Sequence, residues 1–320
     1  MSEIQAYEKA LQIRDEISRV VVGKQEIIEK VLTAILAGGH ILLEDIPGVG
    51  KTTLALAFSK SMGLEFQRVQ FTPDVVPSDI TGFTMFDKNS GLFQYRPGAV
   101  MCNFFLADEI NRTSSKTQAA LLEVMQEGRV TVDGTTHELP KPFVVMATQN
   151  PIGTAGTQML PEAQLDRFMV KLSMGYPDFE AQIHILKDRE KTDPLDQIKN
   201  VVTREEVVSM IEEARTVYVD DKIYRYITTL TEATRKHPYI RLGISPRGAL
   251  ALCAMAKAGA YIKGRDYVVP EDIQRIFHDV YSHRLLLSSK AQLADMTADK
   301  ILDEILVENK APKLDDGVKE

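Results

Sequence analysis

The residues best suited to chemistry lie in the stretch 41–53, where the apolar segment ILLE leads into the loop DIPGVGKTT. Gly48 and Gly50 allow successive backbone N–H groups to face one anionic pocket, and a helix beginning at about Lys51 adds its positive N-terminal end. Lys51 can reach the β- and γ-phosphates of a nucleotide, and the hydroxyl of Thr52 is a suitable Mg²⁺ ligand. The loop residues predicted to bind the nucleotide are Pro47, Gly48, Val49, Gly50, Lys51, Thr52 and Thr53.

The loop departs from the usual phosphate-loop pattern at its first position, where Asp45 replaces glycine. Aspartate tolerates left-handed turn geometry better than most residues, so we interpret the loop as a variant of that pattern. The alternative is an ordinary corner between a strand and a helix. The apolar strand before the loop and the GKTT run inside it favour the nucleotide interpretation.

A second candidate group follows the apolar run FFLA, where Asp108 and Glu109 end a predicted strand. Ligands of open α/β sheets lie at this edge, so both carboxylates are predicted to face the phosphates. Asp108 suits the Mg²⁺ shell, and Glu109 suits activation of the attacking water. An acidic pair often marks no more than the end of a strand, but the phosphate loop upstream favours the catalytic interpretation.

Three further residues are candidates for contacts with the γ-phosphate. Asn150 ends the run FVVMATQN and could bond both the γ-phosphate and the attacking water, although Asn-Pro could equally start a turn. Arg167 precedes the last predicted strand, and Arg247 lies in the first turn of a helix that Ser245 and Pro246 open. An arginine fork stabilises charge on a transferring phosphoryl group. Taken singly, either arginine could instead form a surface ion pair of little energetic value.

These candidates need a sheet to bring them together. Strand-like segments alternate with helical or irregular stretches in the first half, and two are nearly continuous apolar runs, as expected of strands covered on both faces. In the second half the apolar residues recur at helical spacing, with a capping box at Thr203 and Glu206. The predicted strands are 40–44, 66–70, 102–107, 143–148 and 168–173, and the predicted lid helices are 203–217, 222–236, 246–262 and 270–285.

The pattern therefore predicts an α/β fold with a five-stranded parallel sheet flanked by helices, followed by an all-helical lid domain. The predicted boundaries are 1–177 for the nucleotide-binding domain, 178–306 for the lid and 307–320 for a flexible tail.

Two hairpins interrupt the first domain. Residues 129–132 and 135–139 flank Asp133-Gly134, a strong two-residue turn signal, and residues 82–86 and 92–95 flank the run DKNSG. Elements added to a nucleotide-binding sheet are where such a protein is expected to meet its partners.

The composition of the 320-residue chain is that of a soluble globular protein, with 44% hydrophobic and 26% charged residues. The N-terminus has no apolar signal core, and the longest apolar stretches are too short to span a bilayer, so we expect no transmembrane segment and a cytoplasmic protein. Cys102 and Cys253 are expected to be free, and the scattered histidines lack metal-ligand spacing. The net charge of −7 disfavours a broad nucleic-acid surface.

Taken together, the segments from about Val20 to about Leu285 resemble the MoxR family of AAA+ ATPases. Beyond the phosphate loop, the resemblance rests on four segments in the order usual for that family. A generic phosphate-loop protein would not share all of them. They are 71–82 (FTPDVVPSDITG), 107–134 (from ADEINRTSSKTQ to VDG), 147–168 (ATQNPIGTAGTQMLPEAQLDRF) and 243–250 (GISPRGAL).

The resemblance implies an ATPase that uses ATP and Mg²⁺ and acts as a homo-oligomeric ring, usually a hexamer. ATP would lie between the α/β domain and the lid of one subunit and be completed by a neighbour. Asn150 would then be the sensor 1 residue, Arg167 the finger toward a neighbouring γ-phosphate, and Arg247 the sensor 2 arginine. Val22 and Gly23 would lie near the adenine. The two hairpins, in chain order, would be the helix-2 insert and the pre-sensor hairpin.

Members of this family act like chaperones that mature or activate partner complexes, typically with a separate protein carrying a von Willebrand factor A domain. We therefore expect an ATP-hydrolysing motor acting on client protein complexes. Two alternatives stay open: a nucleic-acid translocase or transcription-activator ATPase, and a nucleotide-gated assembly scaffold. The acidic balance disfavours the first, and Glu109 disfavours the second. Arg112, in the run INR, is a candidate for a second arginine at the subunit contact.

Overall fold

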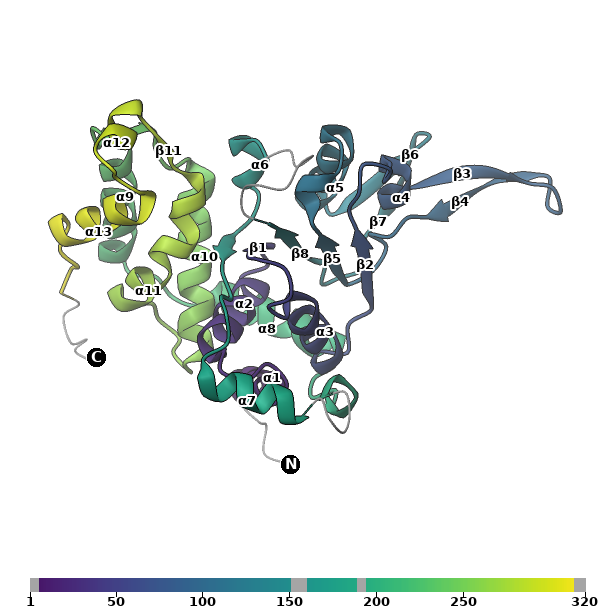
Figure 1. The fold of residues 1–320 in the computed structure, drawn as a ribbon, viewed down its shortest axis with the longest axis horizontal. Helices are drawn as coiled ribbons and strands as arrows, with labels where there is room; N and C mark the ends of the chain where they lie inside the picture. The colour runs from purple at the N-terminus through teal and green to yellow at the C-terminus, as the bar shows by residue number, and fades with distance from the viewer. Residues whose placement is uncertain (1–5, 151–159, 189–193, 314–320) are drawn as a thin grey trace.

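The computed structural model describes residues 6–150, 160–188 and 194–313. Its centre is a parallel sheet of five strands in the order β2-β5-β8-β1-β9, which confirms the predicted α/β class (Figure 1). A helical lid follows the sheet along the chain. In chain order the strands of the sheet are β1 (Ile41–Glu44), β2 (Phe66–Gln70), β5 (Phe104–Asp108), β8 (Val144–Gln149) and β9 (Val170–Leu172).

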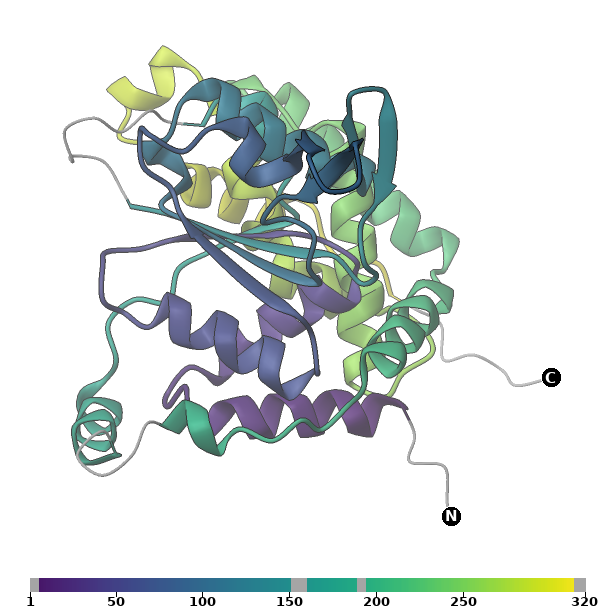
Figure 2. The same ribbon diagram turned by 90° about the vertical axis from the view of Figure 1, so that its right-hand side faces the viewer.

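Helices cover both faces of this sheet, so the central strands β5 and β8 are buried along their whole length (Figure 2). Alternate residues of a strand point to opposite faces. On β5, Phe104 and Leu106 pack toward α1, α2 and α3, whereas Phe105 and Ala107 pack toward α4 and α5. The covering helices are α1 (Ala6–Ser18), α2 (Gln25–Leu36), α3 (Lys51–Ser61), α4 (Pro77–Thr81) and α5 (Ser115–Glu127).

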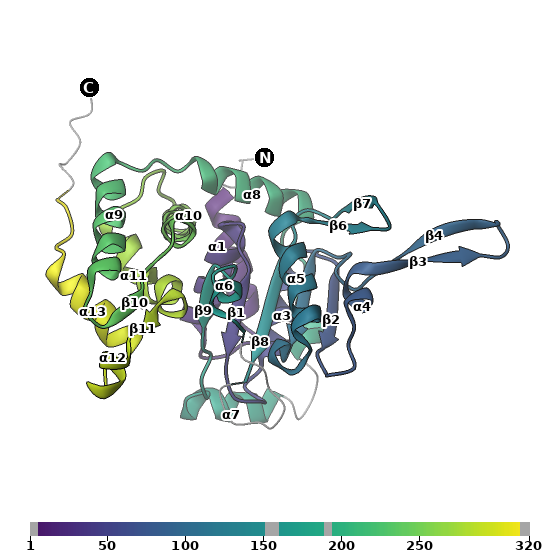
Figure 3. The same ribbon diagram turned by 90° about the horizontal axis from the view of Figure 1, so that it is seen from above.

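Both predicted hairpins are present. Strands β3 (Gly82–Asp87) and β4 (Leu92–Pro97) form an antiparallel ribbon, here called the insert hairpin, that projects from the body (Figures 1 and 3). Strands β6 (Arg129–Val132) and β7 (Thr135–Glu138) form a shorter ribbon, here called the second hairpin. Both turn residues between β6 and β7 have positive φ, 49° and 79°, as the Asp-Gly signal predicts.

Two lid helices, α8 and α10, begin at the predicted caps. The Oγ1 of Thr203 accepts a hydrogen bond from the Glu206 N–H at 3.2 Å, and the Glu206 carboxylate accepts one from the Thr203 N–H at 2.7 Å. Ser245 caps α10 by accepting a bond from the Gly248 N–H at 3.2 Å. The main lid helices are α8 (Arg204–Thr216), α9 (Asp221–Lys236), α10 (Pro246–Ile262), α11 (Pro270–Tyr281) and α13 (Ala298–Glu308).

The lid differs from its prediction in three places. It is not all-helical, because β10 (Ile240–Leu242) pairs with β11 (Leu286–Leu287). Helix α11 ends at Tyr281, since a 3₁₀ turn, η3 (Ser282–Arg284), follows it. Helix α13 runs to Glu308, so the predicted tail starts too early; its last residues, 314–320, lie outside the described part of the chain.

Strand ends differ by a few residues. The strand predicted at 102–107 begins at Phe104, because Cys102 and Asn103 form a bend in which the Asn103 amide donates to the Pro142 carbonyl at 2.9 Å. The remaining short elements are η1 (Ile110–Arg112), α6 (Glu162–Leu165), α7 (Phe179–Asp188), η2 (Pro194–Gln197) and α12 (Ser289–Leu293).

Both cysteines are free, with Cys102 buried and Cys253 half-buried. Within the described residues, no helix is both long and apolar enough to cross a bilayer.

Candidate nucleotide site

The phosphate loop connects β1 to α3, and Gly50 caps the helix that starts at Lys51. Gly48 and Gly50 have φ of 85° and 98°, which side chains disfavour. A Cβ on Gly48 would meet no atom within 4 Å, so the backbone angle rather than lack of space requires glycine there. The first turn of α3 leaves backbone N–H groups free to bind an anion.

The ammonium group of Lys51 lies against the loop itself. It donates to the carbonyls of Asp45 at 2.7 Å and Ile46 at 3.1 Å. Burial lowers the pKa of Lys51, and the negative charges of Asp45, Asp108 and Glu109 oppose that fall. The lysine therefore stands beside the carboxylates predicted from the sequence.

Asp45, which replaces the usual first glycine of the loop, forms hydrogen bonds that the sequence did not indicate. The left-handed geometry inferred for it is wrong, because its φ is not positive. Its buried carboxylate accepts hydrogen bonds from the Ser173 hydroxyl at 2.9 Å, the Met174 N–H at 2.5 Å and the Gly175 N–H at 3.0 Å. Asp45 thus ties the loop to the segment that follows β9.

The carboxylate of Asp108 lies at the predicted edge of the sheet, where β5 ends. Its Oδ1 accepts a hydrogen bond from the Thr148 hydroxyl on β8 at 2.6 Å. Its Oδ2 accepts one from Arg68 Nη2 on β2 at 2.7 Å. The sequence predicts Asp108 as a site residue, but it does not indicate Thr148 or Arg68 as its partners.

Glu109 has a left-handed backbone, with φ 57° and ψ 49°, a conformation that costs a non-glycine residue about 1 kcal/mol or more. The Thr148 hydroxyl stabilises it by accepting the Glu109 N–H at 2.8 Å. Asn150 Nδ2 donates to Oε1 of Glu109 at 2.8 Å, and Gln70 Nε2 and Arg112 Nη1 donate to Oε2 at 2.9 and 2.8 Å. Asn150 therefore contacts the predicted catalytic carboxylate.

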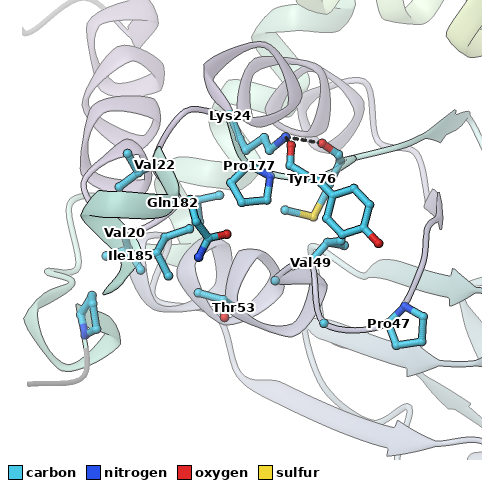
Figure 4. A pocket seen from close by; sticks show the side chains of 15 residues that line it. Val20, Val22, Lys24, Pro47, Val49, Thr53, Tyr176, Pro177, Gln182 and Ile185 are labelled. Carbon is cyan, nitrogen blue, oxygen red and sulfur yellow. Dashed lines mark hydrogen bonds between the residues drawn. The ribbon is translucent and has the colours of Figure 1, made fainter. Parts of the chain in front are cut away.

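A cavity of about 280 Å³ opens beside the phosphate loop (Figure 4). Lys24 donates to the carbonyls of Met174 at 2.5 Å and Tyr176 at 2.8 Å along its wall. Gly23 lies outside the lining and packs on α7, because a Cβ there would come within 2.9 Å of the Ala181 Cβ. The lining residues are Val20, Val21, Val22, Lys24, Pro47, Gly48, Val49, Gly50, Thr53, Met174, Tyr176, Pro177, Gln182, Ile185 and Pro194.

The wall that α7 supplies to this cavity was missed from the sequence. Gln182 and Ile185 reach it from α7, and Tyr176 from the segment before that helix. No local pattern in residues 176–188 marks them, because their role depends on where α7 folds back over the loop.

Arg167 and Arg247 both lie at a second cavity, Arg167 in its wall and Arg247 at its border. This cavity, of about 500 Å³, shares no lining residue with the first. Arg247 Nη2 contacts Gln126 Oε1 at 3.5 Å, and Gln126 lines the same cavity. Neither arginine forms an ion pair within the described residues, and Arg167 Nε is buried without a hydrogen-bond partner there. The lining residues are Ala119, Leu122, Glu123, Gln126, Glu127, Arg129, Thr131, Gln164 and Arg167.

Asp166 explains why the two arginines share a face. Its carboxylate accepts bonds from Ser245 Oγ at 3.0 Å and from Arg284 Nε at 2.8 Å, so the lid docks directly beside Arg167. Arg247, two residues after Ser245, is thereby placed next to that cavity instead of the phosphate loop.

The donor set fits magnesium bound together with nucleotide phosphates. Among the described residues no group of three or more His, Cys, Asp or Glu side chains could hold a metal ion alone. Mg²⁺ needs only one or two protein oxygens when phosphates and waters complete its shell. The Thr52 hydroxyl at the start of α3 and the Asp108 carboxylate are oxygen ligands of this kind.

Comparison with known proteins identifies the family to which this fold belongs. Residues 40–170 match the family model described as ATPase family associated with various cellular activities (AAA), and residues 232–305 match the AAA lid domain. A crystal structure of a candidate ATPase from Cytophaga hutchinsonii superposes with a TM-score of 0.90 at 38% identity, over 96% of both chains. Fold and site together define an AAA+ ATPase with its lid.

Two relatives show which family of AAA+ ATPases the chain resembles. The uncharacterized protein YeaC of Bacillus subtilis is 49% identical over 298 residues, which is 93% of each chain. Chaperone MoxR1 of Mycobacterium tuberculosis is 39% identical over 315 residues, covering 96% of this chain and 81% of the relative. The chain belongs to the MoxR family of AAA+ ATPases.

Proposed function

We propose that the chain assembles in the cytoplasm into a ring, with six subunits as the family usually has, and hydrolyses Mg·ATP to remodel partner proteins. The observation that carries the proposal is the division of the site. The phosphate loop and Glu109 meet at one edge of the sheet, whereas Arg167 and Arg247 line or border a separate cavity. An ATPase with these parts is completed by placing the arginine face of one copy against the phosphate loop of the next.

One half of the proposed site is supplied by the chain that holds the nucleotide. The N–H groups of the loop and Lys51 bind the phosphates, and Thr52 and Asp108 hold the magnesium ion, which supplies charge neutralisation. Glu109 accepts the proton of the attacking water and orients it, and Asn150 keeps the glutamate in position. The cavity at Val22 accommodates the base.

The other half is supplied by the neighbouring copy. An arginine donates several hydrogen bonds from a rigid fork and keeps its charge, which suits the charge that develops on the transferred phosphoryl group. Arg167 has a buried Nε without a partner within the described residues. Because Arg247 faces the same side, we propose that it also acts on the neighbour's nucleotide, not on that of its own chain.

Mixing of inactive variants tests this arrangement. Glu109→Gln lacks the base but keeps both arginines, and Arg167→Ala lacks the finger but keeps the base. In a one-to-one mixture about one site in four combines an intact Glu109 with an intact Arg167, so ATP turnover should return to about a quarter of the parent rate. Arg247→Ala should recover in the same way.

The control mixes Glu109→Gln with Lys51→Ala, because both residues belong to the same half and no mixed site is complete. Absence of recovery with Arg167→Ala would exclude the shared site. Absence of recovery with Arg247→Ala alone would assign that arginine to the nucleotide of its own chain.

The client is proposed from the family and from the name of the mycobacterial relative, which is called a chaperone. We propose a protein client reached through a separate partner with a von Willebrand factor A domain. The test is an inventory, by mass spectrometry, of the proteins and nucleic acids that co-purify with Glu109→Gln in Mg·ATP, with Lys51→Ala as the control. Enrichment of such a partner or of an enzyme complex supports the proposal, and enrichment of nucleic acid would favour a translocase.

A further inference from the structure

Arg68 occupies the side of Asp108 that faces away from Thr148. It lies in the middle of β2, and its side chain is 44% exposed. Its Nη2 donates to Asp108 Oδ2 at 2.7 Å, while Thr148 takes the other carboxylate oxygen. Both oxygens of the predicted magnesium ligand are therefore engaged by the chain's own groups.

We propose that Arg68 is the resting counter-ion of Asp108 and competes with the magnesium ion for this carboxylate. The inference rests on the proposed function, since it takes Asp108 as the metal ligand. A magnesium ligand must present a free oxygen lone pair about 2.0–2.1 Å from the ion. Arg68 covers Oδ2, and its positive charge repels a cation that approaches the same oxygen. Oδ2 keeps a second lone pair beside the bond from Arg68, so the competition is electrostatic. We expect the carboxylate to hold the metal more tightly once Arg68 has swung out toward solvent, which its half-exposed side chain permits.

The same arginine reaches the second carboxylate through Gln70. Arg68 Nη2 donates to Gln70 Oε1 at 3.2 Å, and Gln70 Nε2 donates to Glu109 Oε2 at 2.9 Å. Gln70 and Arg68 are two residues apart on one strand and so project from the same face. Arg68 thereby orients the Gln70 amide toward Glu109, and its departure loosens one of the three bonds that hold the glutamate. Arg68 is in this sense a positioning residue that links metal arrival to release of Glu109.

The experiment measures metal affinity without turnover. Mn²⁺ is titrated into the full chain saturated with the non-hydrolysable analogue AMPPNP, and free Mn²⁺ is followed by electron paramagnetic resonance. Arg68→Gln removes the competing charge and should bind Mn²⁺ about two- to tenfold more tightly than the parent, the range expected for loss of a partly exposed ion pair. Arg68→Lys keeps the charge and should stay close to the parent.

Arg225→Gln is the matched control, because Arg225 forms an exposed ion pair with Asp221 on α9, in the lid. It should leave Mn²⁺ affinity unchanged. Equal affinities for Arg68→Gln and the parent would overturn this inference alone, and weaker binding would do the same by showing that Arg68 assists the phosphates. A parent that holds no Mn²⁺ with AMPPNP would overturn the proposed function as well.

Discussion

Tyr95 lies flat against His137, with ring centroids 3.8 Å apart and ring planes 12° apart. Tyr95 belongs to β4 of the insert hairpin and His137 to β7 of the second hairpin. The Tyr95 hydroxyl also donates to the Thr81 carbonyl at 2.6 Å, which anchors the ring at the foot of the insert. The two hairpins are thus joined at their bases, while the insert's outer half carries exposed apolar side chains on its strands, with Phe93 74% exposed.

This stack should appear as an energetic coupling between the two rings. Tyr95→Ala and His137→Ala are combined in a double-mutant cycle, with stability measured by urea unfolding. We expect a coupling free energy of about 0.5–1.5 kcal/mol, the range measured for aromatic pairs. Strictly additive effects of the two substitutions would mean that the rings touch without stabilising each other.

Arg167→Ala should lower ATP turnover by about 10³ or more, because an arginine finger supplies transition-state charge stabilisation of that size. Affinity for a fluorescent ATP analogue should change little, because the arginine stabilises charge that develops only as the phosphoryl group is transferred. Arg129→Ala is the matched control, as Arg129 lines the same cavity but pairs with Glu127 at 3.3 Å. A variant lacking Arg167 that turns over at the parent rate would remove the finger assignment.

Asp45→Ala should destabilise the fold by about 1–3 kcal/mol, because it leaves the buried N–H of Met174 and the half-buried N–H of Gly175 without their acceptor. Urea unfolding monitored by circular dichroism gives the value. Asp45→Asn, which keeps one carbonyl acceptor, should lose less. If Asp45→Ala unfolds at the same urea concentration as the parent, the tie between the loop and the segment after β9 carries no net free energy.

Because of His40, we expect the fold to lose stability as the pH falls below ~6.5. Its ring is half-buried, with Nε2 donating to the Met125 carbonyl at 3.0 Å and Nδ1 accepting the Val145 N–H at 3.1 Å. Burial lowers its pKa to about 4, against about 6.5 in the unfolded chain. The unfolded state therefore binds the proton first. Neutral His40 makes its full contribution to the free energy of unfolding above pH ~6.5. That contribution falls by up to about 3 kcal/mol as the pH drops from ~6.5 toward ~4.

The measurement is the free energy of unfolding at a series of pH values for the parent and for His40→Gln. The variant keeps a donor and an acceptor but cannot titrate, so its stability should fall less steeply between pH ~6.5 and ~4. Some slope remains, because burial and the neighbouring Arg284 also lower the pKa of His283. Identical slopes for parent and variant would assign the acid sensitivity to other groups.

The elements of the sheet could be predicted because their signals are local. Strand β2 has the predicted bounds, and the apolar runs of β5 and β8 mark central strands. The partners of Asp108 could not be predicted in this way. Arg68 and Thr148 reach it only because the order β2-β5-β8 places strands from distant parts of the chain side by side. A strand's pattern indicates that it pairs, and not with which neighbour.

The position of Arg247 could not be predicted from local sequence either. The sequence indicates that Arg247 begins a helix of the lid, and Ser245 caps that helix as predicted. Where the helix sits depends on Asp166 and Arg284, which are 118 positions apart and meet at 2.8 Å. Local pattern carries no information about a contact of that separation.

The carboxylate of Asp45 connects two walls of the cavity beside the phosphate loop. Asp45 bonds the segment 173–175 from the side of the phosphate loop. Lys24 bonds the carbonyls of Met174 and Tyr176 from the opposite wall of the cavity. That segment leads directly into α7, so the phosphate loop and the helix have little freedom to move independently. Any shift of the loop must carry the start of α7 with it or strip a buried carboxylate of its donors, at a cost of about 1–3 kcal/mol.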